Sequence, residues 1–190
     1  MQIGNALVTG AGKRLGRAMA LYLADRGFDV AVHYSASAEA AEETAAEIRD
    51  RGRRAVTLQG DLLDEAQVIP LVPRAAEALG GPVAVLVNNA SIFEHDTIRN
   101  GTRESWDRHI ESNLRAPFVL TQAMAAAAPP AETEENGEPL ARALVVNMID
   151  QRVRKLTPAF MSYTIAKMGL WAFTQTAAQA LAPDVRVNAI

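Results

Sequence analysis

The fold is decided by residues 3–16, Ile-Gly-Asn-Ala-Leu-Val-Thr-Gly-Ala-Gly-Lys-Arg-Leu-Gly. An apolar run typical of a short buried strand leads into a segment, ending near Arg26, whose apolar positions recur at helical spacing. Gly10 and Gly12 begin the Gly-x-Gly-x-x-Gly pattern, in which backbone N–H groups approach a pyrophosphate at a helix N-terminus. The last glycine, Gly16, falls one residue late, so a tight turn without a ligand is the alternative.

Strands and helices alternate along the rest of the chain. Apolar runs predict further strands at 29–33, 55–58, 83–87, 143–148 and 185–188. Helical patterns predict helices over 37–51, 64–79, 102–128 and 157–181. Because the strands are continuously apolar and alternate with helices, we predict a parallel sheet covered on both faces. This is the doubly wound (Rossmann) α/β fold, with three layers.

Caps and prolines mark the ends of these elements. Ser37 and Asp64 precede two of the helices as candidate caps, and Thr157-Pro158 is typical of a helix start. Pro73 predicts a late start, a bend or a break in the third helix, and Pro117 predicts a bend in the fourth, because proline cannot donate a helical hydrogen bond.

The composition excludes several classes of protein. With 190 residues, 49% of them apolar, the chain predicts one folded domain over 1–190. A formal charge of −3 without a basic run disfavours nucleic acid and membranes as partners. The absence of cysteine and three scattered histidines predict no metal site. No signal peptide or long apolar segment is visible, so we predict a cytoplasmic protein. The polar segment 129–139 predicts a mobile loop.

Polar residues follow four of the predicted strands. Thr9, Asp61, Asn88 and Asp150 each come just after a strand end. The carboxyl ends of parallel strands meet at one edge of the sheet, where doubly wound folds bind their ligands. We therefore expect these four residues to surround one site.

Asp150, Tyr163 and Lys167 are the candidate catalytic residues. A spacing of four places Tyr163 and Lys167 on one face of a helix, one turn apart. An ammonium near a phenol favours the phenolate, so we expect Lys167 to lower the pKa of Tyr163 from about 10. Tyr163 then becomes a proton donor or acceptor near neutral pH. Asp150 has two alternative explanations, a solvated loop residue or a helix cap.

The end of the second strand favours NADP(H) over NAD(H). NAD enzymes usually place an acidic residue there for the ribose 2′-hydroxyl. Residues 33–37 read His-Tyr-Ser-Ala-Ser, without a carboxylate. Lys13, Ser35, Ser37 and His33 are candidates for contacting a 2′-phosphate instead. Taken singly, Ser37 is equally well explained as a cap, and His33 as a residue at a strand edge.

Together these segments resemble the short-chain dehydrogenase/reductase family over essentially the whole chain. The resemblance is carried by Thr9-Gly10 with Gly16, Asp61, Asn88-Asn89-Ala90, Asn113, Tyr163-x-x-x-Lys167 and Arg186-Val-Asn188. Two departures from the usual sequence pattern of the family narrow the resemblance to a subgroup. The family's middle phosphate-loop glycine is Arg14 here, and its usual catalytic serine is Asp150. With His33-Tyr34 and Asn-Asn-Ala-Ser-x-Phe at 88–93, these features are similar to the pteridine reductases.

The resemblance implies NADPH-dependent reduction of a pterin or folate by a homotetramer. It implies that Asp150, Tyr163 and Lys167 are catalytic and that Asn113 positions a proton-relay water. The implied cofactor contacts are Gly10, Lys13, Arg14, Leu15, His33, Tyr34, Ser35, Asp61, Leu62, Asn88, Ala90, Ser91, Tyr163 and Lys167. The implied substrate contacts are Arg14, Ser91, Phe93, Asp150 and Tyr163. Phe93 has the alternative of plugging the sheet edge, Asn113 of bridging backbone groups, and Arg14 of lying on the helix surface.

The carboxylate at 150 favours reduction of a C=N bond over reduction of a C=O bond. A ketone oxygen becomes negative in the reaction and needs a donor, whereas an ionised carboxylate repels it. A pteridine offers a ring nitrogen to protonate and amino hydrogens to anchor. Asp150 either accepts from these hydrogens or, if its pKa is raised, supplies a proton together with Tyr163. The alternatives are a general ketone or oxoacyl reductase and a non-catalytic NADP(H)-binding sensor or scaffold. The family normally continues past Arg186-Val-Asn188 with a substrate-covering segment and a last strand, so we expect both to be absent here.

Overall fold

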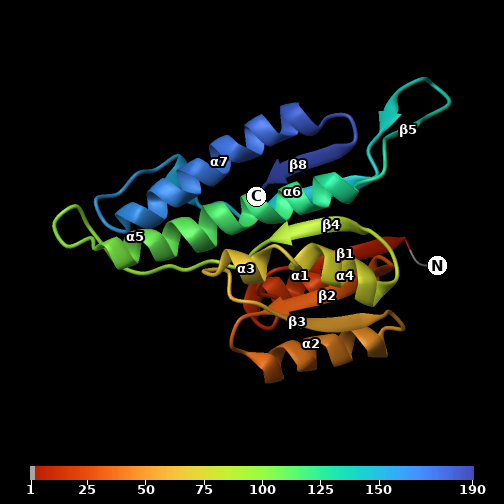
Figure 1. Ribbon diagram of the computed structural model, residues 1–190, viewed down its shortest axis with the longest axis horizontal. Helices are drawn as coiled ribbons and strands as arrows, with labels where there is room; N and C mark the ends of the chain where they lie inside the picture. The colour runs from red at the N-terminus through yellow and green to blue at the C-terminus, as the bar shows by residue number, and fades with distance from the viewer. Residues whose placement is uncertain (1–2) are drawn as a thin grey trace.

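The computed structural model describes residues 3–190, and its centre is a parallel sheet (Figure 1). The strands are β1 (Gly4–Val8), β2 (Phe28–Tyr34), β3 (Ala55–Gln59), β4 (Val83–Asn88), β7 (Ala143–Asn147) and β8 (Val185–Ala189). Across these six strands the order is β3-β2-β1-β4-β7-β8, and each neighbouring pair is parallel. The predicted doubly wound fold is confirmed. Its strand order reverses direction between β1 and β4, which is where such folds bind ligands.

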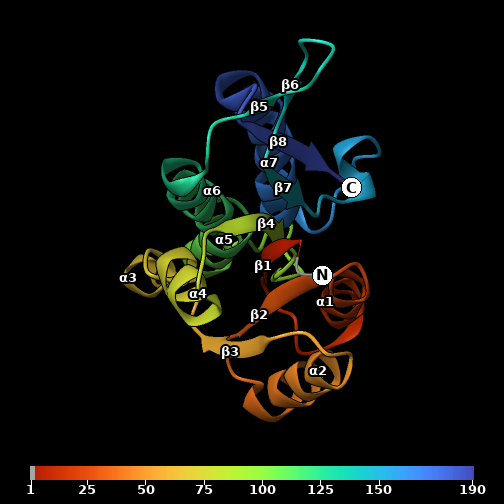
Figure 2. The same cartoon turned by 90° about the vertical axis from the view of Figure 1, so that its right-hand side faces the viewer.

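Helices cover both faces of the sheet and complete three layers (Figure 2). On one face lie α1 (Arg14–Asp25) and α2 (Ala38–Asp50), and on the other lie α4 (Leu71–Leu79), α6 (Ala116–Ala127) and α7 (Met161–Leu181). Because side chains alternate along a strand, β1 directs Ala6 and Val8 to the first layer and Leu7 to the second. All three are fully buried, which explains the continuously apolar strands.

The two proline predictions correspond to irregular helix geometry. The third helix is broken into α3 (Glu65–Val68) and α4, and Pro73 lies in the first turn of α4. In the fourth predicted helix, over 102–128, a π-helical turn (Glu111–Arg115) separates α5 (Arg103–Ile110) from α6. Pro117, the second residue of α6, has no N–H to donate to the carbonyl of Asn113, and the helix is widened at this point.

The start of the last helix differs from the prediction. Thr157-Pro158 precedes it, but α7 begins only at Met161. The residues before it are held by the loop after β4, because the N–H of Phe160 donates to the carbonyl of Asp96 at 2.7 Å. Phe160 also has a φ of 58°, in the left-handed region, which cannot continue a right-handed helix. A tertiary contact therefore overrides the local start signal.

The two predicted caps have different outcomes. Asp64 caps α3 by accepting from the N–H of Ala66 at 3.0 Å. Ser37 stands at the N-cap position of α2, but within residues 3–190 its side chain makes no capping bond, so this prediction is wrong. The predicted loop over 129–139 contains a short antiparallel ribbon, β5 (Glu132–Thr133) and β6 (Pro139–Leu140).

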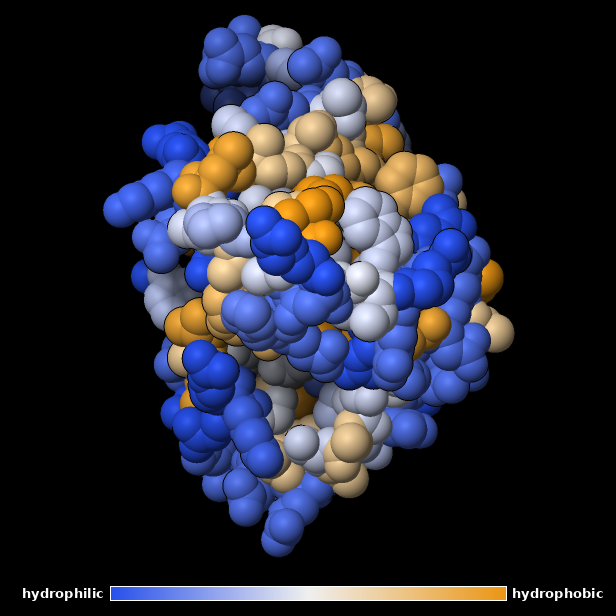
Figure 3. Space-filling view, turned by 90° about the vertical axis from the view of Figure 1, so that its left-hand side faces the viewer, coloured by the Kyte–Doolittle hydropathy of each residue, from blue (hydrophilic) through white to orange (hydrophobic). Residues whose placement is uncertain are grey.

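The carboxyl ends of the strands point to one side of the molecule. Thr9, Asp61, Asn88 and Asp150 lie at or just after the ends of β1, β3, β4 and β7, as predicted. Figure 3 faces this side and shows a hollowed surface. Over residues 3–190, none of the helices combines the length and apolar character needed to cross a bilayer.

Candidate active site

Two cavities adjoin at the carboxyl edge of the sheet, with volumes of about 560 Å³ and about 360 Å³. Gly10, Ala90 and Ser91 line both, so the cavities form one groove. The predicted residues that line the larger cavity are Gly10, Lys13, Arg14, Leu15, Ala90, Ser91, Phe93, Asp150, Tyr163 and Lys167. Those that line the smaller cavity are Gly10, His33, Ser35, Asp61, Leu62, Ala90 and Ser91. The structure therefore brings most of the predicted site together.

Two glycines shape the loop between β1 and α1. Gly10 has a φ of 63°, which residues with a Cβ rarely adopt. A Cβ on Gly16 would lie 2.2 Å from the carbonyl oxygen of Gly10 and 2.5 Å from the side-chain nitrogen of Asn89. A side chain at this position therefore forces the loop to move. The glycine falls at 16, one residue late in the pattern, because this is where the helix passes closest to the loop.

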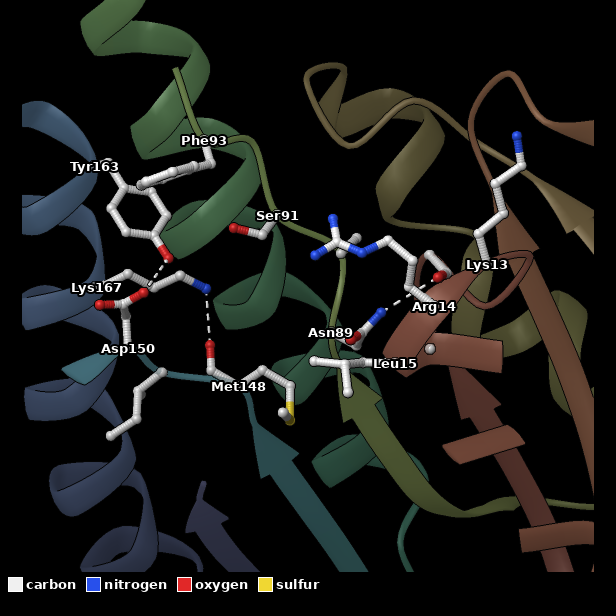
Figure 4. A pocket seen from close by; sticks show the side chains of 14 residues that line it. Lys13, Arg14, Leu15, Asn89, Ser91, Phe93, Met148, Asp150, Tyr163 and Lys167 are labelled. Carbon is white, nitrogen blue, oxygen red and sulfur yellow. Dashed lines mark hydrogen bonds between the residues drawn. The ribbon is translucent and has the colours of Figure 1, made fainter. Parts of the chain in front are cut away.

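Arg14 occupies the place of a family glycine and keeps a glycine-like backbone. Its φ is 50°, a left-handed conformation that costs a residue with a Cβ about 1–2 kcal/mol. In Figure 4 its guanidinium extends into the middle of the cavity on the side of Ser91, whereas Lys13 points away from the Tyr163 end. Arg14 is exposed, but it lines the cavity instead of lying only on the outer surface of α1.

Thr9 and Asn89 join the loop after β1 to the loop after β4. Thr9 Oγ1 accepts from the N–H groups of Asn89 at 2.9 Å and Ala90 at 3.0 Å. Asn89 Nδ2 donates to the carbonyls of Thr9 at 2.8 Å and Gly10 at 3.2 Å. Asn89 was missing from the predicted site residues, although it stands between Asn88 and Ala90 in a motif that carried the resemblance.

Asp150 and Tyr163 form a hydrogen-bonded pair at the other end of the larger cavity (Figure 4). The Tyr163 hydroxyl donates to Asp150 Oδ2 at 3.1 Å. Asp150 Oδ1 accepts from the backbone of Arg152 at 2.9 Å and from its guanidinium at 3.3 Å. Burial raises the pKa of Asp150, but the bonds from Arg152 and Tyr163 and the charge of Arg152 outweigh it and hold that pKa below its usual value. Asp150 is therefore an ionised acceptor at neutral pH, and it also caps the 3-10 turn Gln151–Val153.

The expected lowering of the pKa of Tyr163 is wrong. Burial, the charge of Asp150 and the hydrogen bond to it raise the pKa of Tyr163 to about 12, despite opposing effects of Ser91 and Arg152. Lys167 Nζ donates to the carbonyl of Met148 at 2.7 Å and lies 5.7 Å from the centre of the Tyr163 ring. Burial and the carboxylate bonded to the hydroxyl thus decide the sign of this shift, and Tyr163 keeps its proton at neutral pH.

Lys167 is itself perturbed by its surroundings. It is 3% exposed, and burial lowers its pKa to about 8, although the charge of Asp150 acts in the opposite direction. Removing the ammonium from water penalises its charged form, as expected for a buried lysine. Because this pKa lies close to neutral pH, a negative charge that forms next to Lys167 favours its charged form.

Aromatic side chains form the wall beside Tyr163. Phe93 stacks on Phe160 with ring centres 4.2 Å apart and an interplanar angle of 8°, and it meets the Tyr163 ring edge-on at 4.7 Å. The Arg152 guanidinium lies 5.2 Å from the Phe93 ring and 4.9 Å from the Phe160 ring. Phe93 is 51% exposed and lines the cavity, so it does not plug the sheet edge. Arg152 and Phe160 were not predicted. Phe160 meets Phe93 only through tertiary packing, whereas Arg152 is just two residues from Asp150 and bonds to it locally.

His33 has a different role from the predicted one. Its Nδ1 accepts from the N–H of Gly10 at 3.1 Å, which leaves Nε2 to donate to the carbonyl of Gly60 at 3.0 Å. Burial lowers the pKa of His33 to about 4, so the ring is neutral. A neutral ring with both nitrogens engaged supplies no charge for a 2′-phosphate. His33 instead ties the loop after β1 to the end of β3.

Three predicted residues, Tyr34, Asn88 and Asn113, do not line either cavity. Asn88 Nδ2 donates to Asn147 Oδ1 at 2.8 Å, while Asn88 Oδ1 is buried without a partner among the described residues. Asn113 is fully buried, accepts from the N–H of Ile92 at 3.0 Å and donates to its carbonyl at 2.9 Å. This is the backbone bridge that was the alternative for Asn113.

Comparison with known proteins yields relatives over nearly the whole chain. A 3-oxoacyl-[acyl-carrier-protein] reductase of Staphylococcus aureus is 32% identical over 187 residues, which are 98% of this chain and 72% of the relative. The crystal structure of FolM alternative dihydrofolate reductase 1 from Brucella canis, complexed with NADP, is 43% identical with a TM-score of 0.87 and covers 97% of this chain and 71% of that one. A blue fluorescent protein from a metagenomic library, in complex with NADPH, is 31% identical with a TM-score of 0.89, over 99% and 73% of the two chains.

The sequence model of the family described as short chain dehydrogenase matches residues 4–190. This match spans the sheet, the glycine loop and the Tyr163–Lys167 helix described above. The chain therefore belongs to the short-chain dehydrogenase/reductase family of oxidoreductases.

Proposed function

We propose that this protein is an NADPH-dependent reductase that transfers hydride to a C=N bond of a pterin or dihydrofolate-type substrate. The observation that carries the proposal is the ionised carboxylate of Asp150, which accepts from the Tyr163 hydroxyl at 3.1 Å beside the cavity. In the family, the position of Asp150 is usually a serine. A carboxylate in its place changes which substrates the site tolerates.

The groove fits a dinucleotide. Gly10 and Gly16 allow the backbone to approach a pyrophosphate, and Arg14 offers a cation to a phosphate. At the end of β2, Ser35 lines the smaller cavity, and no carboxylate in 33–37 would repel a 2′-phosphate. The NADP and NADPH complexes of the Brucella and metagenomic relatives support the same cofactor here. The bound cofactor supplies the hydride.

Asp150 suits a substrate that carries N–H groups. Its negative charge repels an oxygen that becomes negative, as a ketone oxygen does, and attracts the amino and ring N–H groups of a pteridine. Phe93 is half-exposed and lines the same cavity, where it offers aromatic surface against which a planar ring can pack. The 43% identity with the Brucella alternative dihydrofolate reductase supports this substrate class.

Tyr163 is the group that delivers a proton to the ring nitrogen. Its pKa of about 12 keeps it protonated at neutral pH, so that it can donate the proton to the substrate nitrogen during the reaction. Lys167, one turn further along α7, stabilises the negative charge left on Tyr163 and Asp150. Asp150 accepts from the substrate and from Tyr163 and does not itself supply the proton.

A general ketone or oxoacyl reductase is the second candidate, because the 3-oxoacyl-[acyl-carrier-protein] reductases of Staphylococcus aureus are 32% identical. This function requires Asp150 to be protonated or turned away from the substrate, whereas its hydrogen bonds favour the ionised form. A non-catalytic NADP(H) sensor does not require the Tyr163–Lys167 pair that this chain retains. The homotetramer implied by the resemblance stays a prediction, which analytical ultracentrifugation tests.

The deciding experiment follows NADPH oxidation with a dihydropterin and with a 3-oxoacyl thioester. We expect kcat/KM to be about 10-fold or more higher for the dihydropterin, since one well-placed charge contributes about 1.4 kcal/mol or more. The Asp150→Ser variant should lose dihydropterin activity and gain thioester activity.

Asp50→Ser, the same substitution at an exposed position of α2, is the control and should behave like the unmodified protein. A thioester preference in the unmodified protein would establish the second candidate instead. Turnover of neither substrate, with tight NADPH binding, would favour the sensor.

A further inference from the structure

A cluster of buried polar side chains lies behind the aromatic wall, outside the groove. Asp96 from the loop after β4, His109 from α5 and Ser162 from α7 are 3%, 0% and 3% exposed. They are adjacent to the site, since Phe93 lies three residues before Asp96 and Tyr163 directly follows Ser162. None of the three has a part in the proposed chemistry.

Asp96 is the centre of this cluster. Its Oδ1 accepts from the backbone N–H of Ser162 at 3.2 Å, and its Oδ2 accepts from the hydroxyls of Ser162 and Ser105. Its carbonyl accepts from the N–H groups of Phe160 at 2.7 Å and Met161 at 3.4 Å. Asp96 thereby satisfies the first N–H groups of α7, a helix of 21 residues whose own cap residue supplies no side-chain bond within the described chain.

His109 completes a directed chain of hydrogen bonds. Its Nε2 accepts from the N–H of Glu94 at 3.0 Å, so Nδ1 carries the proton and donates to Ser162 Oγ at 2.7 Å. The Ser162 hydroxyl in turn donates a hydrogen bond to Asp96 Oδ2. The His109 ring also meets the Tyr163 ring edge-on, with ring centres 5.9 Å apart. One chain of bonds thus links the loop after β4, α5 and the first turn of α7.

We propose that Asp96, Ser162 and His109 form a buried latch that positions the Tyr163 hydroxyl against Asp150 and Phe93, with Asp96 as its central positioning residue. Two further contacts hold the same pair of segments together: Thr97 pairs with Ala159 in an isolated bridge, and Phe93 stacks on Phe160. The carboxylate also places a negative charge at the positive end of the α7 dipole.

The latch explains why a buried carboxylate is placed so close to the site. Proton transfer requires the donor and the acceptor within hydrogen-bonding distance, and a displacement of about 1 Å in a catalytic group lowers the rate by up to about 10²-fold. Tyr163 lies in the first turn of α7, the part of a helix that frays first when its N–H groups lose their acceptors. Fixing this turn therefore fixes the proton donor.

The inference rests on Tyr163 being the proton donor of the proposed function, and the test is the Asp96→Asn variant. We expect kcat to fall about 10-fold or more at saturating NADPH, in line with the cost of misplacing a catalytic group. KM for the substrate and Kd for NADPH should change less than about 3-fold, because the phosphate-binding loop lies at the other end of the groove. The solvent deuterium isotope effect on kcat should increase, because proton transfer becomes slower relative to the other steps.

Asp29→Asn is the matched control. Asp29 is also a buried carboxylate, 1% exposed, and it is paired with Arg53 and Arg54 near the start of β2, away from the strand ends that form the site. It should lower the free energy of unfolding without changing kcat or the isotope effect. Equal kcat in the unmodified protein and folded Asp96→Asn, or equal losses in both Asp→Asn variants, would overturn the latch.

Ser162→Ala keeps the inference testable if Asp96→Asn does not fold. It removes the hydroxyl between His109 and Asp96 but keeps the backbone bond, so we expect a kcat loss of about 3- to 10-fold, the value of one hydrogen bond. Amide exchange of the peptides at 91–97 and 160–165 should rise together in this variant, whatever substrate the enzyme uses. Unchanged exchange would overturn the latch, whereas an unmodified protein that reduces neither substrate would overturn only the proposed function.

Discussion

The two ends of the larger cavity are built in different ways. The glycine end, residues 9–16, is shaped by backbone: Gly10 turns at positive φ, Gly16 lets the helix approach, and Arg14 accepts a left-handed conformation. The acid end consists of Asp150, Tyr163 and Lys167, whose side chains bond to one another or to nearby backbone. The glycine end can bind a phosphate with few titratable groups. The acid end contains the titratable groups whose charges and protons the proposed chemistry uses.

This difference assigns separate tasks to the two ends. Changes at the glycine end should alter cofactor affinity, because the proposed function assigns the phosphates to its backbone N–H groups and Arg14. Changes at the acid end should alter turnover and pH dependence, because the perturbed pKa values of Tyr163 and Lys167 are found there. Each of the following variants tests whether the two ends have these separate roles.

The largest effect is expected for Tyr163→Phe. Loss of the hydroxyl removes the proposed proton donor, so kcat should fall by about 10²- to 10⁴-fold, the usual contribution of a general acid. Kd for NADPH, measured by the change in its fluorescence, should stay within about 3-fold. Tyr22→Phe is the control, since Tyr22 is 56% exposed on α1. A change confined to NADPH affinity would break the division.

Gly16→Ala is the corresponding change at the glycine end. The new Cβ meets the Gly10 carbonyl at 2.2 Å, so the loop must move at a cost of about 1–3 kcal/mol. We expect Kd for NADPH to rise by about 5- to 100-fold, while kcat at saturating NADPH stays within about 3-fold. Gly52→Ala is the control. Its φ of 75° also strains an alanine, but no atom lies within 4 Å of the added Cβ, so it should lower stability and leave Kd unchanged. Unchanged affinity in Gly16→Ala would show that the loop adapts.

The sequence predicts the glycine end well, because local patterns determine it. A strand, a glycine turn and a helix follow one another within fourteen residues, and their spacing alone predicts where phosphate is bound. Of the polar residues after four strands, Asp61 and Asp150 line the groove, whereas Thr9 and Asn88 are buried and line neither cavity. The role of His33 was missed because its imidazole bonds to Gly10 and Gly60, which only the packed sheet brings near it.

The acid end was predicted in its residues but not in its electrostatics. Spacing places Tyr163 beside Lys167, yet the sign of the Tyr163 pKa shift depends on burial and on Asp150, thirteen residues away. Phe160 and Asp96 were also missed, because their contacts with Phe93 and Ser162 are tertiary. Arg152 was missed although it lies only two residues after Asp150. The helix start predicted at Thr157-Pro158 fails for the same reason, since the bond that the N–H of Phe160 donates to the carbonyl of Asp96 decides where α7 begins.

The smallest effect is a pH dependence that distinguishes the two ends without any substrate. The folded pKa of Lys167 is about 8, below its usual 10.5, so between these values the unfolded chain binds more protons than the folded one. The free energy of unfolding should therefore rise with pH above about 8, by at most about 1.4 kcal/mol per unit. The measurement stops near pH 10, where the raised pKa of Tyr163 makes stability fall again.

In urea titrations at pH 7, 8, 9 and 10, the Lys167→Met variant should lose this rise of the unfolding free energy with pH. Gly16→Ala and the exposed-site control Lys155→Met should keep it. Parallel curves for the unmodified protein and Lys167→Met would mean that Lys167 keeps an ordinary pKa, and the acid end would then lack the amine that stabilises charge on Tyr163.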